Sequence, residues 1–531
     1  MKSWPNVSNS REIRIVRGAA NESGWVNLEV ISGEELVGEA PSIGAQPILS
    51  LIHISDLHVC DAQSPARVEL MDRYADPHHP MSEYIPFVGA YRAQELMTAQ
   101  TLESMVQTVN TIKTGIISDR PIDAVVVTGD VTDNAQANEL QWYLTLMDGG
   151  EVHPDSGDLG KWEGVASQDP KIYDRNFWNP EGTPAGCEED FPRSLYGLPT
   201  VPGLTQAVRK PFTATGVSHR WLATHGNHDA LLQGTVPPDE TLKLVATGGT
   251  RLVDLGADID LQKTFSGWNM VGPAKYAQPT SGAYREQSPD ARRRLNAPQD
   301  WAKLHISCEH DGHGLTIDNA KMGTKYWSKD LGDIRLISLD TVNIYGGWQG
   351  SLDETQFNWL KVELANTSPK YFILLSHHPL HSLFNDYAPE GVDRRIAVDE
   401  LREELLKHDR VILWLAGHDH DNRIKYIGVE GRNGFWQIMT SSLIDWPQQG
   451  RLVEILEDKG EIVIATTLFD HQSPTDLAGS TADLSSPVNL AGLSRILSAN
   501  HWQRRKANDF HVELAAGEVA DRNRFLRLTR T

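Results

Sequence analysis

Five short blocks of carboxylate, amide and imidazole side chains recur along the sequence, and these side chains are common ligands of transition metals. The blocks are Asp56-Leu57-His58, Gly129-Asp130, Gly226-Asn227-His228-Asp229, His377-His378-Pro379 and Gly417-His418-Asp419-His420. Mixed oxygen and imidazole ligands suit Mn, Fe, Zn or Co better than a Cys-rich structural zinc site or an all-oxygen calcium loop would. Each block alone is weak evidence, because such residues also form ordinary surface turns. Together they predict a metal site.

Each block follows a short apolar run that is typical of a strand buried on both faces. These runs begin the segments 48–58, 122–130, 220–229, 371–379 and 410–420. Ligands in open α/β sheets bind at the carboxyl ends of the strands, so we expect the five blocks to converge there. Asp56 and His58 are two residues apart, which predicts that they share one side of an extended segment.

Helical patterns separate several of the predicted strands. Helices are expected over 90–115, 351–367 and 392–408. Ser351 with Glu354 predicts a capping box for the second helix, and Asp393 precedes the third. Strands that alternate with helices indicate a layered α/β core.

The expected organisation is one main domain with an extension at each end. We assign residues 46–470 to the main domain, with insertions at about 143–215 and 231–325 that wall the pocket, the second containing a helix near 287–304. Independent domains in place of the insertions are the alternative. Residues 1–45 form a strand-rich extension, residues 425–468 contain a run of strands, and residues 471–531 form a helical tail.

The composition limits the partners. The 531 residues include 71 acidic and 49 basic side chains, a formal charge of -22, which disfavours binding to long nucleic acids. No apolar run is long enough for a membrane span, and the first residues lack a secretory signal, so no membrane partner is expected. Three cysteines are too few for a disulfide framework. These features predict a cytoplasmic protein.

The five blocks, taken in order, resemble the motifs of the calcineurin-like metallophosphoesterase superfamily over about residues 55–425. That resemblance implies a four-layer α/β/β/α sandwich and a centre of two metal ions. The first metal would be bound by Asp56, His58, Asp130 and His420, and the second by Asp130, Asn227, His377 and His418. Asp130 would bridge the two ions. His377 matches the ligand because it lies two residues before Pro379, which makes His378 a neighbour.

The resemblance also implies catalytic roles. His228 would lie beside the phosphate and donate a proton or stabilise the transition state, Asp229 would orient His228, and Asn227 with His228 would contact the substrate. Two divalent cations, two aspartates and a bridging hydroxide leave a formal charge of about +1 to attract a phosphate. The expected reaction is hydrolysis of phosphate esters by this metal-bridging hydroxide.

Two departures from the motifs of related families reduce the number of substrate classes to expect. Asp133 occupies the place of a tyrosine in purple acid phosphatases, and His225 occupies the place of an arginine in protein Ser/Thr phosphatases. We therefore expect a phosphodiesterase or broad phosphatase acting on a small molecule. A nucleotidase or nuclease of the same superfamily is the first alternative, and a non-catalytic metal-binding scaffold is the second.

Other polar residues remain open to two interpretations. Arg67, Arg73 and Arg423 lie near the blocks and either contact phosphate oxygens or form structural ion pairs. Cys308, His310 and His313 have the spacing of an additional metal site, although the glycines around them favour a loop.

Overall fold

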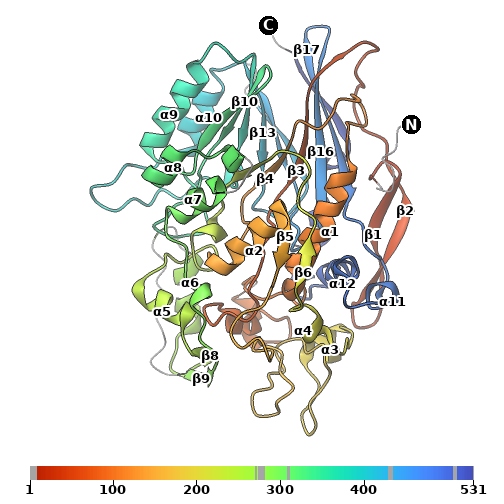
Figure 1. The fold of residues 1–531 in the computed structure, drawn as a ribbon, viewed down its shortest axis with the longest axis vertical. Helices are drawn as coiled ribbons and strands as arrows, with labels where there is room; N and C mark the ends of the chain where they lie inside the picture. Colours follow the sequence, from red (N-terminus) through yellow and green to blue (C-terminus); the bar gives the residue numbers. More distant parts are fainter. Residues whose placement is uncertain are drawn as a thin grey trace.

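Two six-stranded sheets form the centre of the protein (Figure 1). The computed structural model describes residues 9–85, 87–269, 272, 282–307, 311–428, 434–505 and 511–529. The first sheet has the order β18-β17-β16-β3-β4-β7 and the second β10-β11-β12-β13-β15-β14. The strands of the first sheet are β3 (Gln46–Ile54), β4 (Ala124–Thr128), β7 (Trp221–Thr224), β16 (Gln449–Asp458), β17 (Glu461–Asp470) and β18 (Arg524–Thr529). Those of the second are β10 (Trp327–Leu331), β11 (Ile334–Ser338), β12 (Tyr371–Leu375), β13 (Val411–Ala416), β14 (Arg423–Ile427) and β15 (Phe435–Met439).

The strands that precede the five blocks run parallel within their sheets. β3 pairs with β4 and β4 with β7, while β12 pairs with β13 in the second sheet, all in parallel. Their carboxyl ends therefore lie along one edge of each sheet, which is where the predicted ligands begin.

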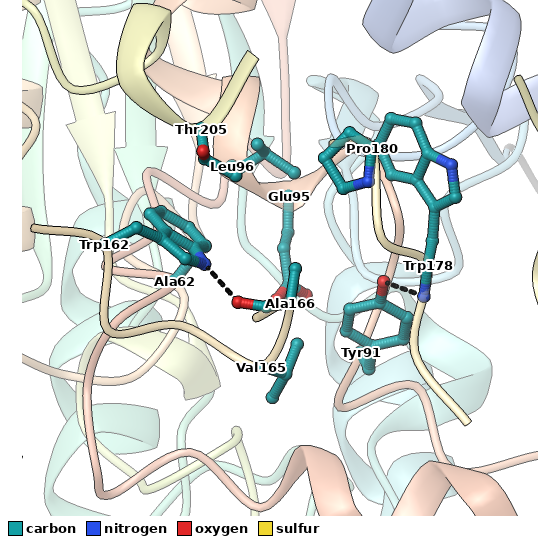
Figure 2. A pocket seen from close by; sticks show the side chains of 10 residues that line it. All are labelled: Ala62, Tyr91, Glu95, Leu96, Trp162, Val165, Ala166, Trp178, Pro180 and Thr205. Carbon is teal, nitrogen blue, oxygen red and sulfur yellow. Dashed lines mark hydrogen bonds between the residues drawn. The ribbon is translucent and has the colours of Figure 1, made fainter. Parts of the chain in front are cut away.

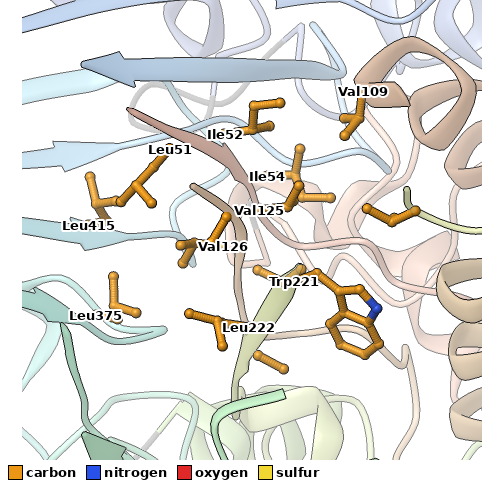
Figure 3. Packing of buried hydrophobic residues seen from close by; sticks show 14 of the residues in the cluster. Leu51, Ile52, Ile54, Val109, Val125, Val126, Trp221, Leu222, Leu375 and Leu415 are labelled. Carbon is orange, nitrogen blue, oxygen red and sulfur yellow. The ribbon is translucent and has the colours of Figure 1, made fainter. Parts of the chain in front are cut away.

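The main hydrophobic core lies between the two sheets. Val126 and Leu222 of the first sheet belong to the same buried cluster as Leu375 and Leu415 of the second (Figure 3). Because these strands are covered on both faces, their sequences read as continuous apolar runs. The packing brings the two sets of strand ends together.

Helices cover the outer face of each sheet. α1 (Thr98–Thr111) and α2 (Ala137–Asp148) pack on the first sheet, and α12 (Pro487–Ala499) packs beside α1. α9 (Glu354–Ala365) and α10 (Val398–Leu405) cover the second sheet. The layers are thus α/β/β/α, as the resemblance implied.

The predicted helix starts need correction. The N-cap of α9 is Asp353, whose side chain accepts a hydrogen bond from the Gln356 amide at 2.7 Å, so the capping box of Ser351 and Glu354 is wrong. Asp393 accepts from the amide of Thr355 in α9 at 3.1 Å and does not begin α10. A carboxylate near a helix in sequence can thus cap a different helix in space.

The two predicted insertions contain short elements, several of which lie below the sheets in Figure 1. The first holds β5 (Gly150–Val152), α3 (Phe191–Tyr196), α4 (Leu204–Ala207) and β6 (Phe212–Ala214), and its predicted start falls inside α2. The second holds α5 (Glu240–Thr247), β8 (Thr250–Leu255), α6 (Leu261–Asn269), β9 (Gly282–Glu286), α7 (Asp300–Ile306) and α8 (Ile317–Met322). The helix expected near 287–304 is therefore shorter and later. Short 3-10 helices are η1 (Glu69–Tyr74), η2 (Pro80–Glu83), η3 (Glu95–Met97), η4 (Asn227–Asp229), η5 (Ala291–Arg293), η6 (Asp311–Gly314), η7 (Leu380–Ser382), η8 (Leu514–Ala516) and η9 (Val519–Asp521).

The two ends of the chain meet at the first sheet. β1 (Ile13–Ala20) and β2 (Val26–Ser32) form an antiparallel hairpin, and Val37 bridges Arg524. The C-terminal segment has α11 (Leu477–Ser480) and α12, but it ends in β18, which pairs antiparallel with β17. The prediction of a helical tail over 471–531 is therefore wrong for its last strand. None of the helices in the described part of the chain has the length and hydropathy to cross a bilayer.

Candidate metal centre

Residues from three of the strand ends converge on one point. Nε2 of His58 lies 3.2 Å from Nε2 of His420, and the latter lies 3.4 Å from Oδ1 of Asp56. Oδ2 of Asp130 lies 3.7 Å from Nε2 of His58. These four residues are the ones predicted to bind the first metal.

A second group shares one oxygen with the first. Oδ2 of Asp130 also lies 3.1 Å from Nε2 of His377, and that nitrogen lies 3.2 Å from Nδ1 of His418. A single carboxylate oxygen thus faces imidazoles from both groups. This is the placement expected of a bridging ligand.

The spacing of these atoms fits metal coordination. Ligands at about 2.0–2.1 Å from a tetrahedral metal are about 3.4 Å from one another, close to the separations above. Asn227 supplies an independent test. Its Nδ2 donates to the carbonyl of Gly234 at 3.0 Å, whereas its Oδ1 is buried with no hydrogen-bond partner in the described part of the protein. Buried acceptors seldom stay unsatisfied, so a cation at Oδ1 would account for it.

The backbone at the ligands is unusual. Asp56, His58, Asp130, His418 and His420 all have positive φ, between 44° and 74°. The segment after β3 is therefore not extended, which corrects the expectation that Asp56 and His58 share a side of a strand. Side chains other than glycine avoid this region, and residues held in it cluster at functional sites.

Two motif glycines are required by close approach between the strand ends. A Cβ on Gly417 would overlap the side chains of Ser55 and Asp56, and one on Gly226 would overlap Asp130. The glycine of each block therefore lets a ligand of a neighbouring strand come close.

Hydrogen bonds behind the ligands fix which imidazole nitrogen faces the centre. Nδ1 of His377 lies 2.9 Å from the carbonyl oxygen of Thr128, which can only accept, so Nδ1 carries a proton and Nε2 is the nitrogen that faces the centre and can bind a metal. Asp133 holds Nδ1 of His58 at 3.1 Å, and Asp445 holds Nδ1 of His420 at 2.8 Å. Such partners orient metal-binding histidines.

Sequence reasoning missed the supporting roles of Thr128, Asp133 and Asp445. Asp133 stands three residues after Asp130, so its place next to a block was a signal. Asp445 follows β15, far from any block, and only the fold brings it to His420.

His378 is occupied by other contacts. Its Nδ1 accepts from the hydroxyl of Thr341 at 2.8 Å, and its Nε2 donates to the carbonyl of Trp348 at 3.0 Å. Both nitrogens are used, which agrees with the choice of His377 as the ligand.

Charges at the centre are strongly coupled. Burial alone would lower the pKa of His377, but Asp130 and Asp56 raise it to about 9. Burial also favours the neutral form of His420, but Asp445 and Asp56 outweigh it and raise the pKa of His420 to about 9. Protons on these histidines balance the buried carboxylates in the absence of cations. The same negative field would attract metal ions.

His228 lies against the shared carboxylate. Its amide donates to Oδ1 of Asp130 at 2.8 Å, and its ring Nδ1 donates to the carbonyl of Asp133 at 2.6 Å. Asp229 does not orient this ring, which corrects the expectation. Its Oδ1 accepts from the amides of Val131 and Thr132, and its Oδ2 accepts from the amide of Gly226. Asp229 therefore fixes the backbone around Asp130.

The nearby arginines form ion pairs. Arg67 is buried and pairs with Asp133 and with Glu95. Arg73 contacts Asp174 and Arg423 contacts Asp421.

The possible extra metal site has no support in the described residues. Cys308 and His310 lie outside the described residues. His313 stacks on the ring of Trp221 and its Nδ1 contacts the Trp221 carbonyl at 3.1 Å.

A small cavity elsewhere is walled by Tyr91, Trp162 and Trp178, with Glu95 at its side (Figure 2). Its volume of about 10 Å³ is enough for one water molecule. It is therefore too small for a substrate.

Comparison with family models finds one match, over part of the chain. Residues 200–422 match the family model for the calcineurin-like phosphoesterases. The matched segment holds Asn227, His377, His418 and His420, whereas Asp56 and Asp130 precede it. The resemblance read from the motifs is confirmed, and a metal-dependent phosphoester hydrolase is supported.

Solved structures similar to this chain share little sequence with it. A dimetal phosphatase from Danio rerio is 11% identical over 80% of this chain and 99% of its own, with a TM-score of 0.36. The sulfate thiohydrolase SoxB from Thermus thermophilus is 11% identical over 82% of this chain and 57% of its own, with a TM-score of 0.28. No curated protein matches the sequence.

Proposed function

We propose that this phosphoesterase hydrolyses small-molecule phosphodiesters with two metal ions. The first ion is assigned to Asp56, His58, Asp130 and His420, and the second to Asp130, Asn227, His377 and His418. The observation that carries the assignment is the position of Oδ2 of Asp130, which lies 3.7 Å from Nε2 of His58 and 3.1 Å from Nε2 of His377 and so faces both groups.

The metals would supply charge and a nucleophile. Two divalent ions of the Mn, Fe, Zn or Co type, when bound, polarise phosphoryl oxygens and lower the pKa of water toward neutrality. The protein residues fix their positions. The amide of His228 and the backbone contacts of Asp229 hold the Asp130 carboxylate between the two groups.

His228 is assigned the proton transfer to the leaving alkoxide. Its Nδ1–H is fixed on the Asp133 carbonyl, so Nε2 is the atom at which a proton is gained or given. His228, His418 and His420 are half-buried, whereas Asp56, Asp130 and His377 are buried. The three half-buried histidines mark the side from which a substrate approaches.

A diester is favoured over a monoester by charge. A monoester carries close to two negative charges near neutral pH, and a diester carries one. The chain has a formal charge of -22, and Arg67 is occupied by ion pairs and does not serve as an additional phosphate contact. A less charged phosphate therefore suits this site better.

The test is a comparison of two chromogenic esters on protein first stripped with a chelator and then supplied with Mn²⁺. Turnover of bis-p-nitrophenyl phosphate exceeding that of p-nitrophenyl phosphate supports the proposal. Turnover of the monoester alone assigns a phosphatase, and silence with Mn²⁺, Zn²⁺, Co²⁺ and Fe²⁺ refutes catalysis. His153→Ala is the matched control for His228→Ala, because His153 is an exposed histidine that pairs with Glu151.

A further inference from the structure

Asp445 gathers charged groups from distant parts of the chain. Its Oδ2 lies 2.8 Å from Nδ1 of His420 and 3.2 Å from Nη1 of Arg504, and Nε of Arg92 lies 3.1 Å from its Oδ1. All three partners and Asp445 itself are largely buried, with Arg92 and Arg504 exposing 6% and 5% of their side chains. One carboxylate therefore meets two guanidinium groups and an imidazole.

The three partners come from segments that are separate in sequence. Arg92 precedes η3, Arg504 follows α12, and His420 follows β13. Gln94 adds a further hydrogen bond, from Nε2 to Oδ1 of Asp445 at 3.3 Å. This arrangement ties the C-terminal segment to the metal centre through one side chain.

The segment that carries Arg504 is itself firmly packed. The ring of Trp502 stacks on that of Tyr196, and its Nε1 donates to Asp76 at 2.6 Å. Gln503 donates to the same carboxylate at 2.9 Å. Arg504 is thus presented to Asp445 by a fixed backbone.

We propose that Asp445 is a positioning residue that sets the affinity of the first metal through His420, and that Arg504 restrains it. This inference rests on the two-metal centre proposed above. A carboxylate that accepts from Nδ1–H makes Nε2 a stronger donor to a metal and fixes its direction. Arg504 contacts the same oxygen of Asp445 as His420 does, so its positive charge reduces the negative charge that this oxygen presents to His420.

The sign of the effect separates positioning from simple structural support. Removing the carboxylate weakens binding of the first metal. Removing Arg504 takes one of two guanidinium groups away from Oδ2, since Nε of Arg92 stays 3.2 Å from that oxygen, and so strengthens binding of the first metal. A merely structural network predicts weaker binding in both cases. The second metal does not contact His420 and is unchanged in both.

The experiment is a titration of metal-free protein with Co²⁺, followed by calorimetry and by the visible absorption of bound Co²⁺. We expect Asp445→Asn to weaken the first binding step about 10- to 100-fold and shift its absorption bands. Arg504→Met should bind the first Co²⁺ ion a few-fold more tightly. A circular dichroism melt checks that each variant is folded. Where Asp445→Asn does not fold, the Asp445→Asn/Arg504→Met double variant removes both charges and carries the same expected loss.

Asp340→Asn is the matched control, because Asp340 is a carboxylate that holds a buried histidine, His225, at 3.1 Å, and neither residue is an assigned ligand. We expect Asp340→Asn to bind the first Co²⁺ ion with the same affinity as the parent. Equal first-step affinity in the parent and in the Asp445 variants, or weaker binding by Arg504→Met, overturns the inference. Absence of Co²⁺ binding by the parent overturns the proposed metal centre itself, so the two failures are distinguishable.

Discussion

The Nε2 atoms of His58 and His420 lie 3.2 Å apart, although 362 positions separate the two residues in the chain. His58 follows a strand of the first sheet and His420 a strand of the second. Their meeting depends on the packing of the two sheets, because neither sheet alone contains both residues. The metal centre therefore exists only when both sheets are folded and packed together.

Asn227→Ala removes the unpartnered amide oxygen from the second group. We expect the second metal to bind more than about tenfold more weakly, while the first is kept, because Asn227 belongs to the second ligand set only. Calorimetric titration with Mn²⁺ resolves the two steps. Asn343→Ala provides a matched control: Asn343 is a buried asparagine whose Nδ2 donates to Asn385 and to the Tyr387 carbonyl. Loss of the first metal in Asn227→Ala would argue against the assignment.

Gly417→Ala tests the close approach of the two sheets. The added methyl group would overlap Ser55 and Asp56, so we expect a loss of about 2 kcal/mol or more in the free energy of unfolding. Urea unfolding of the metal-free protein measures it. Gly267→Ala in α6 is the control, since its Cβ would meet no atom within 4 Å and alanine favours a helix by roughly 0.5–1 kcal/mol. Similar stability of both variants contradicts the explanation of the motif glycine.

His305 predicts a sensitivity to acid that is unrelated to the metal centre. Burial lowers the pKa of His305 to about 4. Its folded pKa is below the unfolded value of about 6.5, so the unfolded state takes up the proton first and stability falls as pH drops from 6.5 toward 4. This one residue should account for about 2 kcal/mol of the loss between pH 7 and pH 5.

The His305→Gln variant isolates that contribution. Its unfolding free energy should decline less than the parent's over the same pH range, as measured by urea unfolding at both pH values. A parallel decline in the two proteins would mean that His305 is protonated as easily in the folded state.

Local sequence was sufficient to predict the strands that end in ligands. The apolar runs before Asp56, Asp130 and His377 became β3, β4 and β12 because strands covered on both faces contain few polar residues. β10 and β11 were missed, since Trp327–Leu331 has three consecutive polar residues between its two apolar ends. The resemblance to the family came from the order of the five blocks along the chain, and no single strand indicated it.

The supporting side chains were beyond local reasoning. Asp445 and Arg504 acquire their roles only when β15, α12 and the strand ends pack together. The positive φ values of His418 and His420 also had no signal in residue type, since glycine and asparagine are the residues expected there. Hydrogen bonds between remote segments follow no sequence period, so the fold must be known first.

The shared carboxylate is the centre of the account, and metal analysis of three proteins tests it most directly. The parent, Asp130→Ala and His228→Ala are each loaded with Mn²⁺, dialysed and measured by mass spectrometry, with turnover followed in parallel. We predict two ions per chain in the parent and in His228→Ala, which loses most turnover, and none in Asp130→Ala. Two ions retained by Asp130→Ala, or equal metal loss in both variants, would contradict the account.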